Sequence, residues 1–167
     1  MTKYLLKPIL KTIKEGFTLV NENEEIVYVG QMTKFSLFGA SPFNFTNHVT
    51  NKTEEHKLGK TVTTEESGLV DFFSTSSYFK YDGVKIWDYL HDKGIRINSS
   101  LSANKIGMTY EVSLEGKEIA TISSSTPKGK SFITTDKYYE VNCDENNLDI
   151  VFLVAFSIAR CNQTFVN

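Results

Sequence analysis

An almost uninterrupted apolar segment near the carboxyl end, residues 148–159, constrains this chain more than any other feature. It reads Leu-Asp-Ile-Val-Phe-Leu-Val-Ala-Phe-Ser-Ile-Ala, and Asp149 and Ser157 are its only polar positions. Because these apolar side chains leave no face of a helix or strand for water, the segment must be buried on all sides. We therefore expect it to form the centre of the hydrophobic core.

We predict that this segment is a helix, although its valines and isoleucines also suit a strand. Its length exceeds that of an ordinary strand. Asn and Asp residues precede it, where they can cap a helix, and Arg160 follows it, where a cation favours the helix terminus. The segment is too short to cross a bilayer, which needs about 20 apolar residues.

The chain before this segment alternates between short apolar runs and polar turns, as strands do. The expected strands cover residues 3–13, 17–20, 26–29, 32–38, 43–51, 56–64, 69–79, 95–101, 108–114, 117–123, 131–135 and 138–142. The clearest hairpin turns at Glu115-Gly116. Residues 43–64 are more polar and look peripheral, so their pattern does not fix a strand registry. We place their turn at residues 52–55, which makes Glu54 and Glu55 solvated turn charges.

One segment has helical spacing instead. Ile86, Trp87 and Leu90 lie on one face of a predicted short helix over residues 82–93. Asp82 is its expected N-cap, and Gly94 is a natural left-handed terminator. Trp87 is expected to anchor this helix to the sheet.

Length and composition indicate one globular domain that does not bind nucleic acid. The chain has 167 residues and a formal net charge of −2, with a pI near 5.9. A dedicated nucleic-acid-binding domain would carry clustered basic residues. Lysines interrupt the apolar residues at the amino end and no cleavage site follows them, so we expect no secretory signal and a cytoplasmic protein.

No set of residues typical of catalysis, a metal or a cofactor is visible. The three histidines, His48, His56 and His91, do not have the spacing of a helical metal pair. Cys143 and Cys161 bracket a helix about 25 Å long, far beyond the roughly 7 Å that a disulfide spans between Cα atoms. We expect free, inert thiols, and we predict no catalytic residue, no metal and no cofactor.

Three parts of the sequence resemble the tubby C-terminal-like superfamily. They are residues 81–90 (Tyr-Asp-Gly-Val-Lys-Ile-Trp-Asp-Tyr-Leu), the hairpin over 110–122, and the closing apolar helix. The superfamily includes plant LURP-one-related proteins, phospholipid scramblases and small bacterial members, which residues 3–30 resemble most. The resemblance implies a mainly β (α+β) fold over residues 1–167. Its core would be a closed antiparallel β-barrel of about twelve strands around a central hydrophobic C-terminal helix, with one short peripheral helix.

The resemblance also implies a non-enzymatic binding or interaction module. Its expected partner is a phospholipid headgroup at the cytoplasmic membrane surface, or another protein, and the candidate contacts are Lys52, Lys57 and Lys60. Acidic residues beside these lysines reduce any local positive field. Two alternatives stay open: an enzyme of unrecognised type, and a structural or protein-interaction barrel with no lipid role.

Overall fold

The computed structural model describes residues 1–9, 15–36, 40–61, 78–103, 107–124 and 138–166. Eleven strands form one antiparallel sheet in the order β7-β6-β5-β4-β3-β2-β1-β11-β10-β9-β8. The strands are β1 (Thr2–Pro8), β2 (Gly16–Val20), β3 (Ile26–Met32), β4 (Ser41–Asn47), β5 (Lys52–Thr61), β6 (Tyr78–Tyr81), β7 (Val84–Lys85), β8 (Ile95–Leu101), β9 (Met108–Leu114), β10 (Lys117–Ser124) and β11 (Tyr139–Cys143). The predicted mainly β architecture is confirmed.

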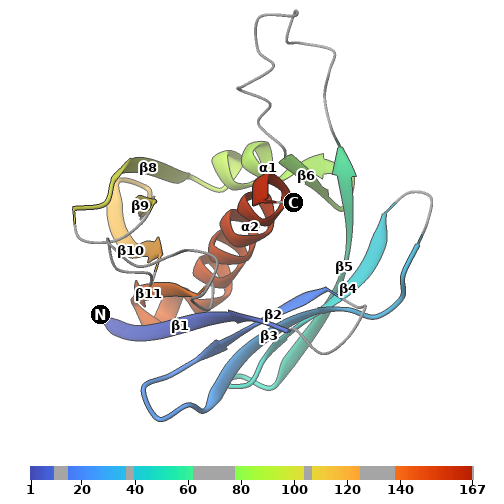
Figure 1. The fold of residues 1–167 in the computed structure, drawn as a ribbon, viewed down its shortest axis with the longest axis horizontal. Coiled ribbons are helices and arrows are strands. Elements are labelled where there is room, and N and C mark those ends of the chain that lie inside the picture. Colours follow the sequence, from blue (N-terminus) through green and yellow to red (C-terminus); the bar gives the residue numbers. More distant parts are fainter. Residues whose placement is uncertain (10–14, 37–39, 62–77, 104–106, 125–137, 167) are drawn as a thin grey trace, which may run out of the picture.

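The sheet curls around a long helix, α2 (Leu148–Val166), as Figure 1 shows. The described strands leave β7 and β8 as the two ends of the sheet, and the predicted closure into a barrel of about twelve strands is not confirmed. The helix α1 (Ile86–Asp92) connects these two ends along the chain and lies between β6 and β8. The sheet thus has an open side, and α1 covers it.

The apolar segment is the central helix, as predicted, and it is buried all round. Phe152, Phe156, Val151 and Val154 have no exposed surface, although they point in different directions from the helix axis. A 3-10 turn, Glu145–Asn147, precedes the helix, and Asp144 caps this turn by accepting a hydrogen bond from the Asn146 N–H. The expectation that no face of this segment is free for water is confirmed.

The helix is longer than predicted, and Arg160 does not end it. Arg160 lies inside α2 and is buried, with its Nη2 3.4 Å from a carboxylate oxygen of Glu15 and its guanidinium 5.0 Å from the centre of the Phe43 ring. The ion pair and the aromatic face compensate for burying this cation. Arg160 is therefore a packing residue rather than a terminator.

The predicted turn between β4 and β5 is wrong by several residues. The chain turns at residues 48–51, because the Asn47 side chain accepts hydrogen bonds from the N–H groups of Val49 and Thr50. Residues 52–55 instead belong to β5, which puts Glu54 in the sheet. The prediction that this hairpin is peripheral is also wrong for one face, since Phe43 and Phe45 are buried in the core.

The predicted strand over residues 32–38 is wrong for its described part, because Met32 is the last residue of β3 and residues 33–36 are not in a strand. Residues 33–36 form the connection to β4, and the Ser36 N–H donates to the Ser41 Oγ. Phe35 is 56% exposed in this connection. Of the expected strand over 69–79, residues 78–79 belong to β6, and residues 69–77 lie outside the described residues, as does the expected strand over 131–135.

The predicted role of Asp82 as a helix cap is wrong. Asp82 and Gly83 have φ angles of +50° and +85° and form the two-residue turn between β6 and β7. Asp-Gly is a favoured pair for such a turn, because both positions need left-handed backbone. Helix α1 begins only at Ile86. Gly94, at φ +79°, follows it as predicted, and Trp87 packs against the core as expected.

Candidate functional site

A pocket of about 250 Å³ lies between the inner face of β3–β6, the helix α1 and the first turns of α2. Most of its wall is aromatic or aliphatic, and several charged groups project into it. The lining residues are Tyr28, Phe45, Glu54, His56, Tyr81, Tyr89, Leu90, Lys93, Ile95, Asp149, Ile150 and Leu153. Seven different elements therefore meet at this one hollow.

The aromatic part of the wall is a packed cluster centred on Tyr81. The His56 ring stacks on Tyr81 at 4.4 Å between centroids, and Tyr89 contacts the same ring at 4.7 Å. Phe45 meets Tyr81 edge-on at 6.4 Å. Because neighbours hold these rings in place, their faces toward the pocket are preorganised.

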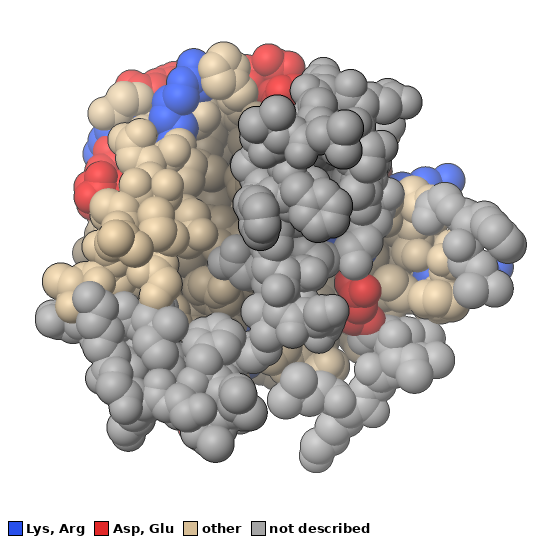
Figure 2. All heavy atoms as spheres, turned by 45° about the horizontal axis from the view of Figure 1, so that its top comes forward, with Lys and Arg blue, Asp and Glu red and all other residues tan. Residues whose placement is uncertain are grey.

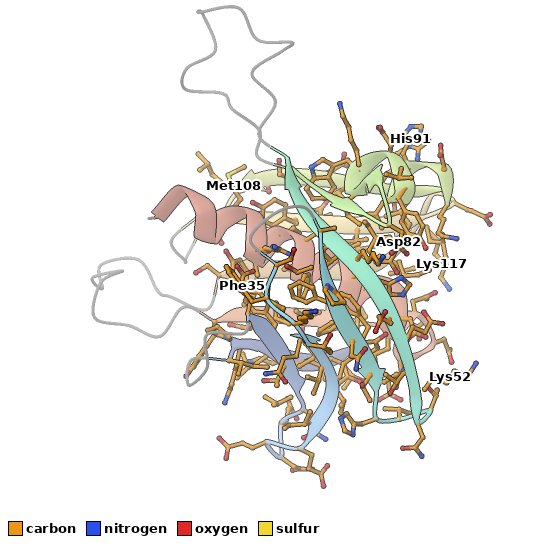
Figure 3. All side chains as sticks on the ribbon, turned by 90° about the vertical axis from the view of Figure 1, so that its right-hand side faces the viewer. Phe35, Lys52, Asp82, His91, Met108 and Lys117 are labelled. Carbon is orange, nitrogen blue, oxygen red and sulfur yellow. The ribbon has the colours of Figure 1, made fainter. Side chains whose placement is uncertain are left out.

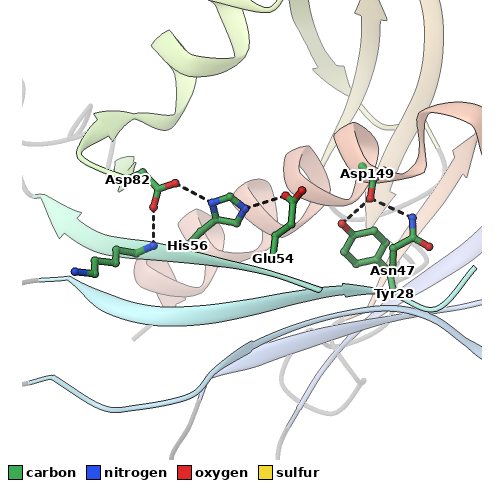
Figure 4. A network of polar contacts seen from close by, with 7 residues as sticks. Tyr28, Asn47, Glu54, His56, Asp82 and Asp149 are labelled. Atoms are coloured by element: carbon green, nitrogen blue, oxygen red, sulfur yellow. Dashed lines mark hydrogen bonds and ion pairs between the residues drawn. The ribbon is translucent and has the colours of Figure 1, made fainter. Parts of the chain in front are cut away.

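His56 lies between two carboxylates, as Figure 4 shows. Its Nδ1 is 2.8 Å from Asp82 Oδ2, and its Nε2 is 3.2 Å from Glu54 Oε2. Only the doubly protonated ring can donate to both. The other oxygen of Asp82 accepts a 2.8 Å hydrogen bond from the Lys57 N–H, which ties the β6–β7 turn to β5.

The ionised form of Asp82 is stabilised in this network. Partial burial opposes its ionisation, but the hydrogen bond from His56, the hydrogen bond from the Lys57 N–H and the nearby positive charge outweigh that effect. Together they hold the pKa of Asp82 below its usual value. The carboxylate is therefore charged at neutral pH.

A second polar group stands at the start of α2. Asp149 Oδ1 accepts hydrogen bonds from the Tyr28 hydroxyl at 2.8 Å and from the Asn47 amide at 3.1 Å. Burial, and then the hydrogen bond to Asp149, raise the pKa of Tyr28. Burial, and then the neighbouring Tyr89, raise the pKa of Tyr81. Both hydroxyls therefore stay protonated, and that of Tyr28 donates to Asp149.

A lysine lies over one aromatic face of the wall. Lys93, directly after α1, has its Nζ 5.0 Å from the centre of the Tyr89 ring. This distance is within the range of cation–π attraction. A cation of the protein itself is thus accommodated against the aromatic wall.

The structure does not bring Lys52, Lys57 and Lys60 together. All three belong to β5, but Lys52 and Lys57 are an odd number of residues apart and so point to opposite faces of the sheet. Lys60 is eight residues from Lys52, or about 26 Å along the strand. Figure 3 shows Lys52 at the far end of β5 from Asp82. In Figure 2, acidic and basic side chains of the described residues are interspersed.

The polar residues that lie together at this pocket were not predicted from the sequence. Placing residues 52–55 in a turn hid the alternation that puts Glu54, His56 and Leu58 on one face of β5. Assigning Asp82 to a helix hid its place in an Asp-Gly turn, although that dipeptide is a strong hairpin signal. No local pattern connects Tyr28 with Asp149.

Other candidate chemistry is not found at this pocket. Its described lining contains no Ser, Thr or Cys that could act as a nucleophile. In the part of the chain that the structure describes, no three His, Cys, Asp or Glu residues could hold a metal ion. Cys143 is a buried free thiol, and burial raises its pKa to about 12, as expected of an inert thiol. The Cys161 side chain lies outside the description.

Comparison with known proteins identifies no relative: no family model, curated protein or solved structure matches this chain. Among the described residues, no helix has both the length and the apolar character needed to cross a bilayer. The case for function therefore rests on the geometry of the pocket.

Proposed function

We propose that this protein is a non-enzymatic binding module whose ligand site is the pocket between α1, α2 and β3–β6. The observation that carries the proposal is the convergence of charged and hydroxyl groups from β3, β5, β6, α1 and α2 on one preorganised hollow with aromatic walls. Binding sites typically combine a mostly apolar wall with a few placed polar groups. Because the described strands do not close into a barrel, helix α1 forms one wall of this pocket in place of a further strand.

Binding fits this pocket better than catalysis. A general base such as His56 needs a nucleophile or a water within reach, and both of its ring nitrogens already contact carboxylates. The raised pKa values keep the Tyr28 and Tyr81 hydroxyls protonated, which makes these two groups poor nucleophiles. The Asp82–His56 pair is the one feature that favours the alternative, an enzyme of unrecognised type. A hydrolysis screen with a His56→Gln control tests that alternative.

The resemblance to the tubby C-terminal-like superfamily supports the same class of function and adds two finer proposals. One is that the eleven-stranded sheet is a variant of that family's barrel of about twelve strands. The other is that the ligand is a phospholipid headgroup at the cytoplasmic membrane surface. Because Lys52 and Lys57 face opposite ways, the pocket is a better candidate for that contact than the lysines of β5.

A ligand screen read out by NMR tests the proposal. A panel of small metabolites, lipid headgroups and short peptides is added to ¹⁵N-labelled protein, and amide shifts are mapped on the sequence. We expect at least one compound to shift the amides of Glu54, Tyr81 and Tyr89 selectively. Compounds that shift only residues on β9 and β10, or a panel without any hit, would overturn the proposal.

Flotation with liposomes, at low and high salt, separates a membrane ligand from a free one. Electrostatic attraction to a charged headgroup is screened by salt, so flotation that depends on it weakens as salt rises. Hits in the pocket without flotation would leave the binding function intact and remove the membrane role. A partner protein is the remaining class, and the peptides in the panel represent it.

A further inference from the structure

We infer that the pocket binds the ammonium group of a small organic cation between its aromatic faces and its carboxylates. This inference rests on the proposed function and adds the chemical class of the ligand. Three independent features of the wall support it: the aromatic rings, the sign of the fixed charge, and the lysine that already lies against one ring.

Three aromatic rings line the pocket. Tyr81 and Tyr89 are in contact with their ring planes 54° apart, and Phe45 meets Tyr81 edge-on. Aromatic faces carry negative electrostatic potential, and cages of such faces recognise ammonium groups. A neutral apolar ligand would gain burial from the same rings but no attraction to their faces.

The fixed charges of the wall favour a cation over an anion. Among the described residues of the lining, Glu54 and Asp149 are the carboxylates and Lys93 is the only lysine. Any positive charge on His56 is bracketed by Glu54 and Asp82. The first turn of α2 would attract an anion by its dipole, but Asp149 already occupies that position. A phosphate or carboxylate entering the pocket would therefore meet carboxylates.

Asp149, in the pocket lining, also has acceptor capacity left for a ligand. Both of its hydrogen bonds from the described residues fall on Oδ1, from Tyr28 and Asn47. A carboxylate oxygen accepts two hydrogen bonds, and Oδ2 receives none from the described part of the chain. This oxygen can accept a hydrogen bond from a primary ammonium group or form an ion pair with a quaternary one.

Lys93 shows that a cation is accommodated at this wall. Its ammonium lies over the Tyr89 ring, at the rim of the pocket, on an exposed side chain that can move aside. It is thus an internal competitor for an ammonium ligand. The volume of about 250 Å³ is below the range of pockets for drug-sized ligands, which matches a compact headgroup rather than a long molecule.

The first test compares choline with its neutral isostere, 3,3-dimethylbutan-1-ol, by NMR titration and calorimetry of the full chain. The two probes have the same shape and differ in charge. We expect choline to shift the amides around Tyr81, Tyr89 and Glu54, and to bind about tenfold more tightly than the alcohol, as a partly desolvated cation–π site would require. Equal affinity would overturn the inference.

Two variants, each with a matched control, test the contacts. Glu54→Gln should weaken choline about threefold to tenfold, whereas Glu55→Gln, on the opposite face of β5, should leave it unchanged. Lys93→Met should tighten choline by a similar factor, because it removes the competing cation, whereas Lys117→Met on β10 should have no effect. Weaker choline binding by Lys93→Met would overturn the inference, since Lys93 would then support the bound cation rather than compete with it.

The source of the ammonium group is tested with vesicles. Flotation with phosphatidylcholine but not with phosphatidylglycerol would identify the lipid headgroup, and choline binding without flotation would identify a free amine. If acetate, inorganic phosphate or neutral compounds bind in the pocket and choline does not, the inference fails and the proposed function stands. If no compound of the full panel perturbs the pocket, both fail.

Discussion

The packing around the central helix predicts that replacing Gly30 in β3 even by alanine lowers the stability of the protein. A Cβ at this position would lie 3.0 Å from the Cε1 atoms of both Phe45 and Phe152, and 3.2 Å from the Phe152 Cζ. Neither ring can move away freely. Phe152 stacks on Tyr28 at 4.1 Å between centroids and contacts Phe45 and Phe156 at 6.0 Å each. One added methyl group must therefore push the Phe45 and Phe152 rings aside by a few tenths of an ångström.

The expected cost follows from two opposing effects. Overfilling a packed core costs about 1 to 3 kcal/mol, whereas Gly→Ala lowers the entropy of the unfolded chain and gains about 0.4 to 1 kcal/mol. Gly30→Ala should therefore lose about 1 to 2 kcal/mol of unfolding free energy. For a chain of this size, that loss lowers the Tm by about 2 to 8 °C.

Gly59 in β5 is the matched control. A Cβ there would meet Ala40 at 3.5 Å, an ordinary van der Waals contact. Gly59→Ala should therefore keep only the entropic gain and raise the Tm by about 1 to 4 °C. Thermal melts and urea unfolding of both variants measure the difference. A Gly30→Ala protein at least as stable as Gly59→Ala would refute the packing described here.

Two further predictions concern pH. Because the folded pKa of Asp82 lies below the unfolded value of 3.8, its contribution to stability is present above that value and is lost as the pH falls through the folded pKa. Asp82→Asn should lower the free energy of unfolding by up to about 1 kcal/mol at pH 7, as the loss of an exposed ion pair does, and should not change it in strong acid. Urea unfolding at both pH values measures this, and a loss of the same size at both would contradict the prediction. At the alkaline end, burial raises the pKa of Tyr4 from 10.0 to about 12 and raises the pKa of Tyr28 and Tyr81 as well, so stability should fall as the pH rises above about 10. In an alkaline titration followed by phenolate absorbance, these three tyrosines should ionise well above pH 10 or only when the protein unfolds. Ionisation of all eight tyrosines near pH 10, in a protein that keeps its native circular dichroism, would contradict the prediction.

Features with a local signal could be predicted from the sequence. The central helix follows from an apolar segment with no polar face, and its burial required no knowledge of its partners. The hairpin at Glu115-Gly116 follows from two residues, which adopt φ angles of +51° and +85°. Gly94 likewise ends α1 through its own backbone preference. In each case the information lies within a few residues of the feature.

The candidate site could not be predicted because its contacts are long-range. His56 and Asp82 are 26 residues apart, and Tyr28 and Asp149 are 121 apart. These contacts depend on the strand register, and a turn over residues 52–55 does not give the register of β5. The turn lies at residues 48–51 instead, four residues earlier, because the Asn47 side chain accepts hydrogen bonds from backbone N–H groups of that turn.

The central claim, that α2 is a core helix enclosed by one sheet, is tested most directly by Phe152→Asp. Phe152 has no exposed surface, and truncation to alanine alone should cost about 3 to 5 kcal/mol of the 5 to 15 kcal/mol that stabilises a domain. An aspartate there would place an unpaired charge among aromatic rings. Circular dichroism of the purified variant should show no cooperative thermal unfolding. A soluble Phe152→Asp protein that melts near the wild-type temperature would contradict the account, because it would make α2 a peripheral helix that awaits a membrane or a partner.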